Sequence, residues 1–189
     1  SMDKTALYTL LYKNAMTGDA DGGGVVAYNY LSGEPVTGLE YGKPMYFRTP
    51  GVKFTLANFF RAEIMSAFAA LKIGNDILFE KEQATAQQFT GHGGLFKVEG
   101  VAQQILADAM NTSISVMKTA GEGGAWGMAL LAAYMDNNDK ALPDWLENCV
   151  FAGMEKTTLS PVSDGVSGFT VFMERYKAGL AAEKAATEV

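Results

Sequence analysis

The spacing of apolar residues along this chain predicts a helix-dominated α/β fold with short strands. Apolar positions recur every three to four residues in several stretches, which is the spacing of one helix face. The helices predicted in this way cover residues 3–16, 56–73, 75–84 and 167–182. Two more helices are predicted: one ends near Met110, and the other begins at residue 125 and ends between residues 132 and 138. Alternating apolar and β-branched residues predict strands at residues 25–31 and 113–117.

Glycine, proline and acidic residues mark the connections between these elements. Residues 18–24 (GDADGGG) are typical of a connecting turn, because they lack the lysine and the serine or threonine that end a P-loop. Gly74 is expected to interrupt the long helix, and Glu34 to lie in a turn. The remaining expectations are irregular segments at residues 37–50 and 156–164, a short helix starting at residues 143–146, and a frayed end at residues 183–189.

Residues 91–94 (GHGG) and 121–124 (GEGG) form two glycine-rich loops, each followed by a helical pattern. Because glycine lacks a Cβ, its backbone can adopt positive φ and lie directly against a ligand. A helix that follows presents unpaired N–H groups and the positive end of its dipole, which attract a phosphate. The two loops therefore indicate either a nucleotide seat or, in the simpler interpretation, tight turns between strands and helices.

Composition restricts the classes of protein to which the chain can belong. The 189 residues are 48% hydrophobic, which suits one globular domain with a substantial core. A net charge of −6 argues against nucleic acid and anionic membranes as partners, and no apolar run reaches the roughly 20 residues of a membrane span. The single cysteine, Cys149, excludes internal disulfides and favours a reducing, cytoplasmic location. We expect its side chain to be buried.

Four segments carry a resemblance to a known family. GHGGLFK, QILADAMNTSISVM and TAGEGGAWGMALLAAYM lie between residues 91 and 135, and GDADGGGVVAYNYLSGEPVTG lies upstream of them. Together they resemble the C-terminal, nucleotide-binding lobe of the FGGY carbohydrate kinases, most of all the xylulose-kinase-like branch. The resemblance implies an actin-like, ribonuclease-H-like α/β fold, helix-rich with a short mixed sheet, in which residues 1–189 form a single domain. It also implies that the N-terminal, sugar-binding lobe lies outside this chain.

The first glycine loop matches part of the adenosine motif of this family. Gly93 and Gly94 match its glycine pair, which lets the backbone approach the adenosine and the α-phosphate. Leu95 is then expected either to wall the adenine, together with Phe96, or to pack in the core. Lys97 is expected either to reach a phosphate or to contact only solvent.

Gly121, Gly123 and Gly124 match the second loop of the motif. Their expected role is close packing of a helix against a strand beneath the nucleotide, and Glu122 is expected to stabilise the helix dipole. Trp126 is expected to lie in the core rather than to stack on the base. The resemblance implies ATP or ADP with Mg²⁺ as the cofactor, without metal-binding residues in this chain.

Phosphoryl transfer also needs a general base for the attacking hydroxyl. In the family this base is an aspartate that precedes the matched segment, and no comparable motif surrounds Asp19, Asp21, Asp76 or Asp108. We therefore expect no catalytic residue in this chain and no sugar phosphorylation by the chain alone. His92 is the only histidine, so it cannot form a histidine cluster for a metal ion. We expect it to be a positioned loop residue.

Three functional hypotheses follow. The first is the ATP-binding part of a cytoplasmic kinase that transfers the γ-phosphoryl of ATP to a ketose, such as xylulose or a related pentulose, with the sugar contacted through the other lobe. The second is a non-catalytic interaction module, in which aromatic residues and ten methionines mark a surface for docking another chain. A domain without its other lobe is also expected to expose an apolar face through which it would dimerise. The third is another member of the same superfamily, such as an acetate-type kinase or a sugar-kinase-like regulator.

Overall fold

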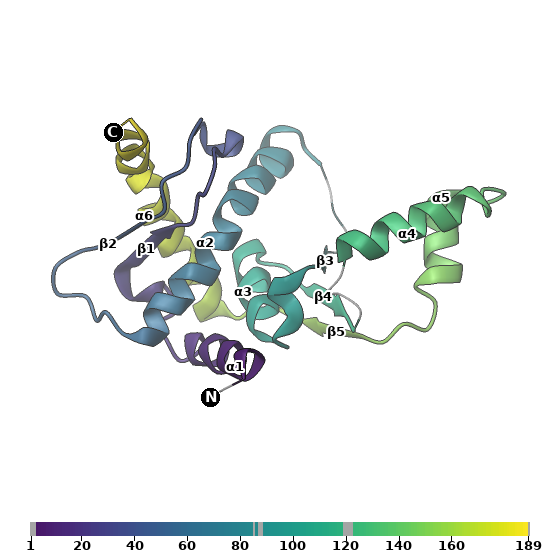
Figure 1. Cartoon of the computed structure of the whole chain (residues 1–189), viewed down its shortest axis with the longest axis horizontal. Coiled ribbons are helices and arrows are strands. Elements are labelled where there is room, and N and C mark those ends of the chain that lie inside the picture. The colour runs from purple at the N-terminus through teal and green to yellow at the C-terminus, as the bar shows by residue number, and fades with distance from the viewer. Residues whose placement is uncertain (1–2, 85, 87–88, 119–122, 189) are drawn as a thin grey trace.

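Helices surround two small β-sheets, and a helical segment extends to one side of them (Figure 1). This computed structural model describes residues 3–84, 86, 89–118 and 123–188. The α-helices are α1 (Lys4–Ala15), α2 (Leu56–Asp76), α3 (Val101–Met110), α4 (Gly123–Met135), α5 (Leu142–Trp145) and α6 (Ser163–Thr187). The short 3₁₀ turns are η1 (Gly22–Gly24), η2 (Pro35–Thr37) and η4 (Gly94–Lys97), and the π-helical turns are η3 (Ile77–Lys81) and η6 (Leu146–Val150). The strands are β1 (Val25–Tyr28), β2 (Met45–Arg48), β3 (Phe89–Gly91), β4 (Ile114–Met117) and β5 (Lys156–Leu159).

The first sheet is an antiparallel pair of β1 and β2, in which Val25 lies opposite Arg48. All four residues of β1 are buried, since α2 and α6 pack against the strand. The strand predicted at residues 25–31 is therefore confirmed in its first four residues. The irregular segment predicted at residues 37–50 is wrong at β2, because this short strand owes its conformation to pairing with β1.

The second sheet has the order β3–β4–β5, with β3 parallel and β5 antiparallel to β4. α3 connects β3 to β4 and packs against α2 and α6. The strand predicted at residues 113–117 is confirmed as β4. The loop predicted at residues 156–164 is confirmed only at residues 160–162, because residues 156–159 pair with β4 and residue 163 already begins α6.

α2 runs through Gly74 and continues into η3. The interruption predicted at Gly74 and the separate helix predicted at residues 75–84 are therefore wrong. A glycine inside a helix costs about 1 kcal/mol relative to alanine. Burial of the apolar face of α2, which includes Ile64, Met65 and Phe68, offsets this cost.

α6, the longest helix, crosses the first sheet (Figure 1). The sequence places five apolar residues on one face of this helix: Phe169, Phe172, Met173 and Tyr176 are buried, and Leu180 is partly buried. The helix extends beyond the predicted range 167–182 at both ends. Glu183 is fully buried and accepts the backbone N–H of Lys43 at 3.0 Å, so the predicted fraying is wrong as far as Thr187. Neither α6 nor any other described helix is long and apolar enough to cross a membrane.

The glycine-rich turn at residues 18–24 connects α1 to β1, as predicted. The three glycines of η1 have φ values of 72°, 62° and 81°, a region that residues with a Cβ rarely adopt. Arg175 of α6 donates to the carboxylate and to the backbone oxygen of Asp21. The turn is therefore held against the C-terminal helix.

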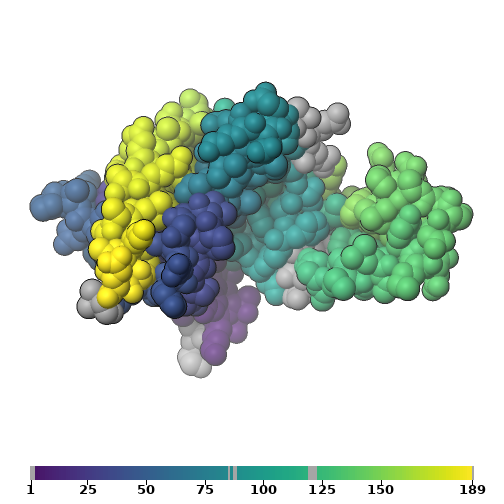
Figure 2. Space-filling view, turned by 90° about the horizontal axis from the view of Figure 1, so that it is seen from above, coloured from purple at the N-terminus to yellow at the C-terminus, as the bar shows by residue number. Residues whose placement is uncertain are grey.

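Residues 123–155 form the helical extension, which lies between β4 and β5 in sequence and contains α4, α5 and η6. Figure 2 shows it in green as a separate mass beside the body of the protein. Aromatic pairs hold it together: the rings of Tyr134 and Trp145 lie 5.4 Å apart, and those of Trp126 and Phe151 lie 5.9 Å apart. The short helix predicted at residues 143–146 corresponds to α5.

Candidate functional site

The structure brings the two glycine loops together at one edge of the second sheet. β3 and β4 are parallel neighbours, so the segments that follow their carboxyl ends meet at the same edge. The first loop begins at Gly91, the last residue of β3, and α4 begins at Gly123 in the second loop. A Cβ added at Gly123 would lie 2.6 Å from the Cβ of His92, so the two segments are in direct contact. Gly121 and Glu122 lie outside the described residues.

The first loop leaves one side of its backbone open. Gly93 has φ 115° and ψ 175°, a conformation available essentially only to glycine. A Cβ added at Gly93 or at Gly94 would meet no atom within 4 Å, so a ligand has room to approach both residues. Gly94 begins only the short turn η4, and α3 starts at Val101. The expectation of an α-helix directly after this loop is therefore wrong.

Leu95 and Phe96, which follow the open glycines, pack against the core. A Cβ added at Gly91 would lie 2.7 Å from the Phe96 ring, whose centroid is 6.4 Å from that of Phe68 in α2. Leu95 is partly buried and lines a cavity between α1 and α2. These contacts favour core packing for both side chains over an adenine wall.

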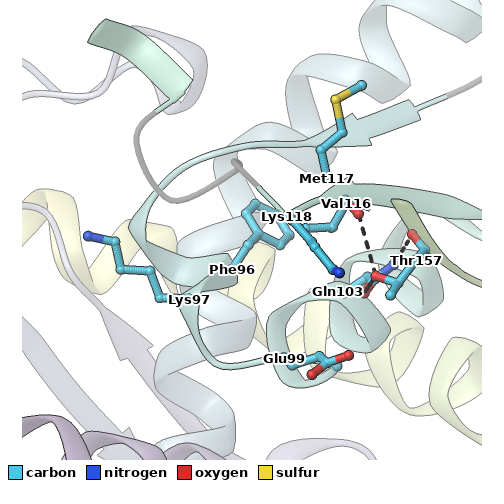
Figure 3. Close-up of a pocket in the computed structure, with 9 residues that line it drawn as sticks. Phe96, Lys97, Glu99, Gln103, Val116, Met117, Lys118 and Thr157 are labelled. Atoms are coloured by element: carbon cyan, nitrogen blue, oxygen red, sulfur yellow. Dashed lines mark hydrogen bonds between the residues drawn. The ribbon is translucent and has the colours of Figure 1, made fainter. Parts of the chain in front are cut away.

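A cavity of about 350 Å³, the lysine cavity, lies beside the first loop (Figure 3). Its polar lining comes from Lys97, Glu99, Gln103, Lys118 and Thr157. The Gln103 amide donates to the backbone oxygens of Ile114 and Thr157 at 2.9 and 3.0 Å, which holds α3 to both strands. In Figure 3, Lys118 extends toward Gln103, whereas Lys97 points away from it.

Two further cavities lie between this edge of the sheet and the helical extension. The apolar cavity, of about 440 Å³, is lined by His92, Gly124, Trp126, Leu142, Leu146 and Phe151 among others. A middle cavity of about 510 Å³ shares His92 and Phe151 with it and shares Met117 with the lysine cavity. The rings of His92 and Trp126 stack with their centroids 6.2 Å apart. The three cavities therefore form a series along the edge where the glycine loops meet.

The second loop differs in part from the sequence-based expectation. Trp126 is half-buried on the wall of the apolar cavity rather than in the core, because no residue of α4 is buried. Close packing explains Gly123, whose added Cβ would clash with His92. A Cβ added at Gly124 would meet no atom within 4 Å, so close packing does not explain this glycine.

His92 is a positioned loop residue, as predicted, since its side chain contacts Gly123 and Trp126. Within the described parts of the chain, no group of three or more histidine, cysteine or acidic residues is arranged to hold a metal ion. Cys149 is exposed, and the Lys140 ammonium lies 4.0 Å from its sulfur. The expected burial of Cys149 is wrong, because η6 lies at the surface of the helical extension.

Sequence comparison assigns the chain to a family. Residues 2–135 match the model of the C-terminal domain of the FGGY family of carbohydrate kinases. The chain belongs to this family. A comparison with curated proteins gives no match.

Solved structures of carbohydrate kinases share the fold of this FGGY domain. The xylulose kinase from Rhodospirillum rubrum matches with a TM-score of 0.69 and 18% identity, over 95% of this chain and 34% of that chain. The gluconate kinase from Lactobacillus acidophilus matches with a TM-score of 0.69 and 18% identity, over 97% and 36% of the two chains. The glycerol kinase from Plasmodium falciparum, solved with ADP, matches with a TM-score of 0.65 and 16% identity, over 96% and 33%. The predicted actin-like ATPase fold is confirmed, and the chain spans about a third of the length of these kinases.

Four aspartates of the FGGY domain were considered above as possible general bases, and each has a structural partner. Asp19 accepts from Asn58, Asp21 from Arg175, Asp76 from Lys72, and Asp108 from the backbone N–H of Val162. None of the four lines the three cavities beside the glycine loops. These carboxylates therefore hold helices and turns together.

Several residues beside the loops of the FGGY domain were missed by sequence reasoning. Gln103, Lys118 and Phe151 line the cavities but belong to no motif. The spacing of Leu142 and Leu146 signals one apolar helix face. The spacing alone does not show what this face covers. In the structure it covers the apolar cavity next to the second loop.

Proposed function

We propose that this chain is the nucleotide-binding lobe of a kinase that transfers the γ-phosphoryl of ATP to a ketose hydroxyl, with xylulose or a related pentulose as the substrate. The observation that carries the proposal is the contact of the two glycine loops, through His92 and Gly123, beside one series of cavities. Family membership supports the phosphotransferase chemistry. The structural matches include xylulose, gluconate and glycerol kinases, so the choice of a pentulose rests on the sequence resemblance.

The order of the cavities suits one orientation of the nucleotide. Adenine would lie in the apolar cavity against Trp126, and the phosphates would extend past Gly93 and Gly94 toward the lysine cavity. Open backbone at glycines suits phosphate oxygens, and Lys118 would exchange its exposed ion pair with Glu155 for a phosphate. Mg²⁺ would be held by phosphate oxygens and water, as is usual for this ion.

We further propose that residues 1–189 form one domain and that the rest of a cytoplasmic kinase supplies the sugar pocket and the general base. The chain spans about a third of the solved kinases that it matches. Closure of two lobes over the nucleotide would exclude water from the reacting phosphate. The isolated chain should therefore bind nucleotide without phosphorylating a sugar, and sugar-dependent ADP release by a pure preparation would contradict this division.

Calorimetric titration with Mg·ADP and Mg·ATP tests the placement of the nucleotide. Gly94→Asp puts a carboxylate where a phosphate would lie, and Gly94→Ala adds only a methyl group at the same position. Ala182→Asp adds the same charge at an exposed position of the C-terminal part of α6, a segment that lies away from the loops in Figure 1. Gly94→Asp should weaken binding by more than tenfold, or about 1.4 kcal/mol, Gly94→Ala by less, and Ala182→Asp not at all. Equal affinity of the wild type and Gly94→Asp would contradict the placement.

One observation favours the alternative, a non-catalytic interaction module that forms a homodimer or binds another chain. α4 exposes Met128, Leu131 and Met135, which are 68%, 49% and 74% accessible. Neighbouring exposed apolar side chains of this size often mark an interface. Sedimentation of the wild type and of the double variant Leu131→Glu, Met135→Glu distinguishes the kinase lobe from the interaction module. A dimer that the double variant dissociates, combined with no nucleotide binding by the wild type, would favour the module.

A further inference from the structure

A cavity of about 320 Å³, the aromatic pocket, lies between α1, α2 and β2. Its lining includes Tyr8, Tyr12, Tyr46, Phe59, Phe60 and Glu63. It shares no lining residue with the three cavities beside the glycine loops. Its volume lies at the lower end of the range of small-molecule sites, about 300–1,000 Å³.

Helical spacing gathers the side chains of the aromatic pocket. Tyr8 and Tyr12 are four residues apart on α1, and Phe59 and Glu63 are four residues apart on α2, so each pair shares a helix face. α1 packs against α2. β2 adds Tyr46 from a third direction, because this residue lines the same cavity. Three separate elements thus contribute to one site, and α1 is distant from β2 and α2 in the sequence.

The aromatic rings of the pocket are set at different angles. The rings of Tyr46 and Phe59 stack with centroids 5.1 Å apart, and Phe60 meets Phe59 at 85° with centroids 5.4 Å apart. The face of an aromatic ring attracts a cation. The protein already uses this attraction at the margin of the aromatic pocket. There the Arg48 guanidinium lies 5.4 Å from the centroid of the Phe54 ring, and Phe54 contacts Phe59 edge-on.

Glu63 gives the aromatic pocket a negative charge. The Tyr46 hydroxyl donates to its carboxylate, and the Asn29 amide donates to its backbone oxygen at 3.3 Å, so the residue is held in place. Among the described residues, no lysine or arginine forms an ion pair with Glu63. Burial raises the pKa of this carboxyl above its ordinary range, as expected for a partly buried acid without a counter-charge.

From this combination we propose that the aromatic pocket binds a free organic cation of the alkylammonium class. Aromatic faces attract positive charge but accept N–H hydrogen bonds poorly, so a methylated ammonium, which has few or no N–H donors, loses least on leaving water. Its methyl groups pack against the rings, and its charge supplies the counter-charge that Glu63 lacks. Anionic ligands are disfavoured by the same carboxylate.

Choline and 3,3-dimethylbutan-1-ol, an uncharged molecule of the same shape, test the proposal in parallel calorimetric titrations of the chain. Choline should bind at least about tenfold more tightly, because both ligands fill the pocket and only one carries a charge. Equal affinities, or no measurable binding of choline, would overturn the proposal. Binding to phosphatidylcholine vesicles without binding to free choline would also overturn it, since the pocket would then recognise a lipid surface.

Two variants assign the binding to the aromatic pocket. Glu63→Gln removes the charge at constant size, and Phe59→Leu removes an aromatic face while leaving an apolar side chain. Each should weaken choline binding at least about fivefold, and Glu63→Gln should leave the uncharged analogue unaffected. Glu174→Gln, at an exposed position of α6, is the matched control and should change nothing. Thermal unfolding shows whether each variant is folded, and undiminished choline binding by a folded Glu63→Gln would place the ligand elsewhere.

Discussion

Asp21 illustrates, at the scale of single residues, how a charged pair holds the glycine-rich turn to α6. Its carboxylate accepts from the Arg175 guanidinium and, at 2.9 Å, from the backbone N–H of Gly23. Burial alone would raise the pKa of Asp21, but these hydrogen bonds and the charge of Arg175 lower it below its ordinary value. The ionised carboxylate therefore stabilises the folded state.

Asp21→Asn should lower the free energy of unfolding at neutral pH by about 0.2–1 kcal/mol, the range for ion pairs near the protein surface. Because the folded-state pKa is lowered, the stabilisation is present above the unfolded pKa of about 3.9 and is lost as the pH falls through the folded value. The difference between wild type and variant should therefore shrink below about pH 4. Urea unfolding at neutral pH and near pH 3 measures it, and a difference that is constant with pH would contradict this assignment.

Gly124→Ala should show whether the glycine at this position is needed for a ligand to approach the backbone or for packing within the protein. The added methyl group meets open space, and alanine favours a helix over glycine by up to about 1 kcal/mol. We expect Tm to rise by up to about 2–4 °C, while nucleotide affinity falls because the methyl group occupies the ligand's approach. Gly127→Ala, which also meets open space, is the control for helix stabilisation. A fall in Tm for Gly124→Ala would show that the position is packed.

Single residues divide clearly into those that the sequence could predict and those that it could not. Asp3 and Glu34 each accept a backbone N–H within three residues, and helix caps and turn residues of this kind follow from the local sequence. Gln103, Lys118 and Phe151 line cavities because folding brings α3, β4 and η6 to one edge. Their roles depend on partners far away in the chain, and no short pattern records such partners.

The elements show the same division between local and distant causes. The apolar face of α6 was predictable from its period, but both ends of the helix depend on other elements. Asp108 of α3 accepts the N–H of Val162 at 2.8 Å at the start of α6, and Lys43 donates to Glu183 near its end. The strands β2 and β5, four residues each, likewise form through pairing with β1 and β4.

Glu183→Ala should destabilise the domain, although the sequence suggests that this end of the chain frays. The substitution removes the acceptor of the Lys43 N–H and opens a void at a fully buried position, which should cost about 1–3 kcal/mol. Glu188→Ala, at an exposed position beyond the helix, should have no effect. Chemical unfolding of both variants measures the difference, and equal stability would mean that the last turns of α6 do not contribute.

For the whole molecule, the two connections of the helical extension to the body lie side by side at the ends of β4 and β5. Met117 of β4 lies opposite Lys156 of β5, so the chain leaves and re-enters the sheet at neighbouring positions. The main hydrophobic cluster draws its residues from the body alone. Family and fold were predictable because their motifs occur in order along most of the chain. The shape of the extension was not predictable, because no residue of α4 is buried to impose a helical period.

Replacing residues 118–155 with Asn-Gly should leave the body folded. A two-residue turn suits a directly opposed antiparallel pair such as Met117 and Lys156. Helical circular dichroism and cooperative unfolding should persist, while nucleotide binding should be lost with the second loop and the apolar cavity. Choline binding serves as the control for an intact aromatic pocket. An unfolded product would show that the body requires the extension.

The position of β1 between α2 and α6 has a consequence for the newly made chain. The Tyr28 hydroxyl donates to the backbone oxygen of Tyr176 at 2.6 Å, across 148 residues of sequence. At about 5–20 residues per second, the ribosome would release α6 roughly 7–30 s after β1. During that interval one side of an entirely apolar strand has no cover. The nascent polypeptide, rather than the finished protein, is therefore the state in which this fold depends most on chaperones.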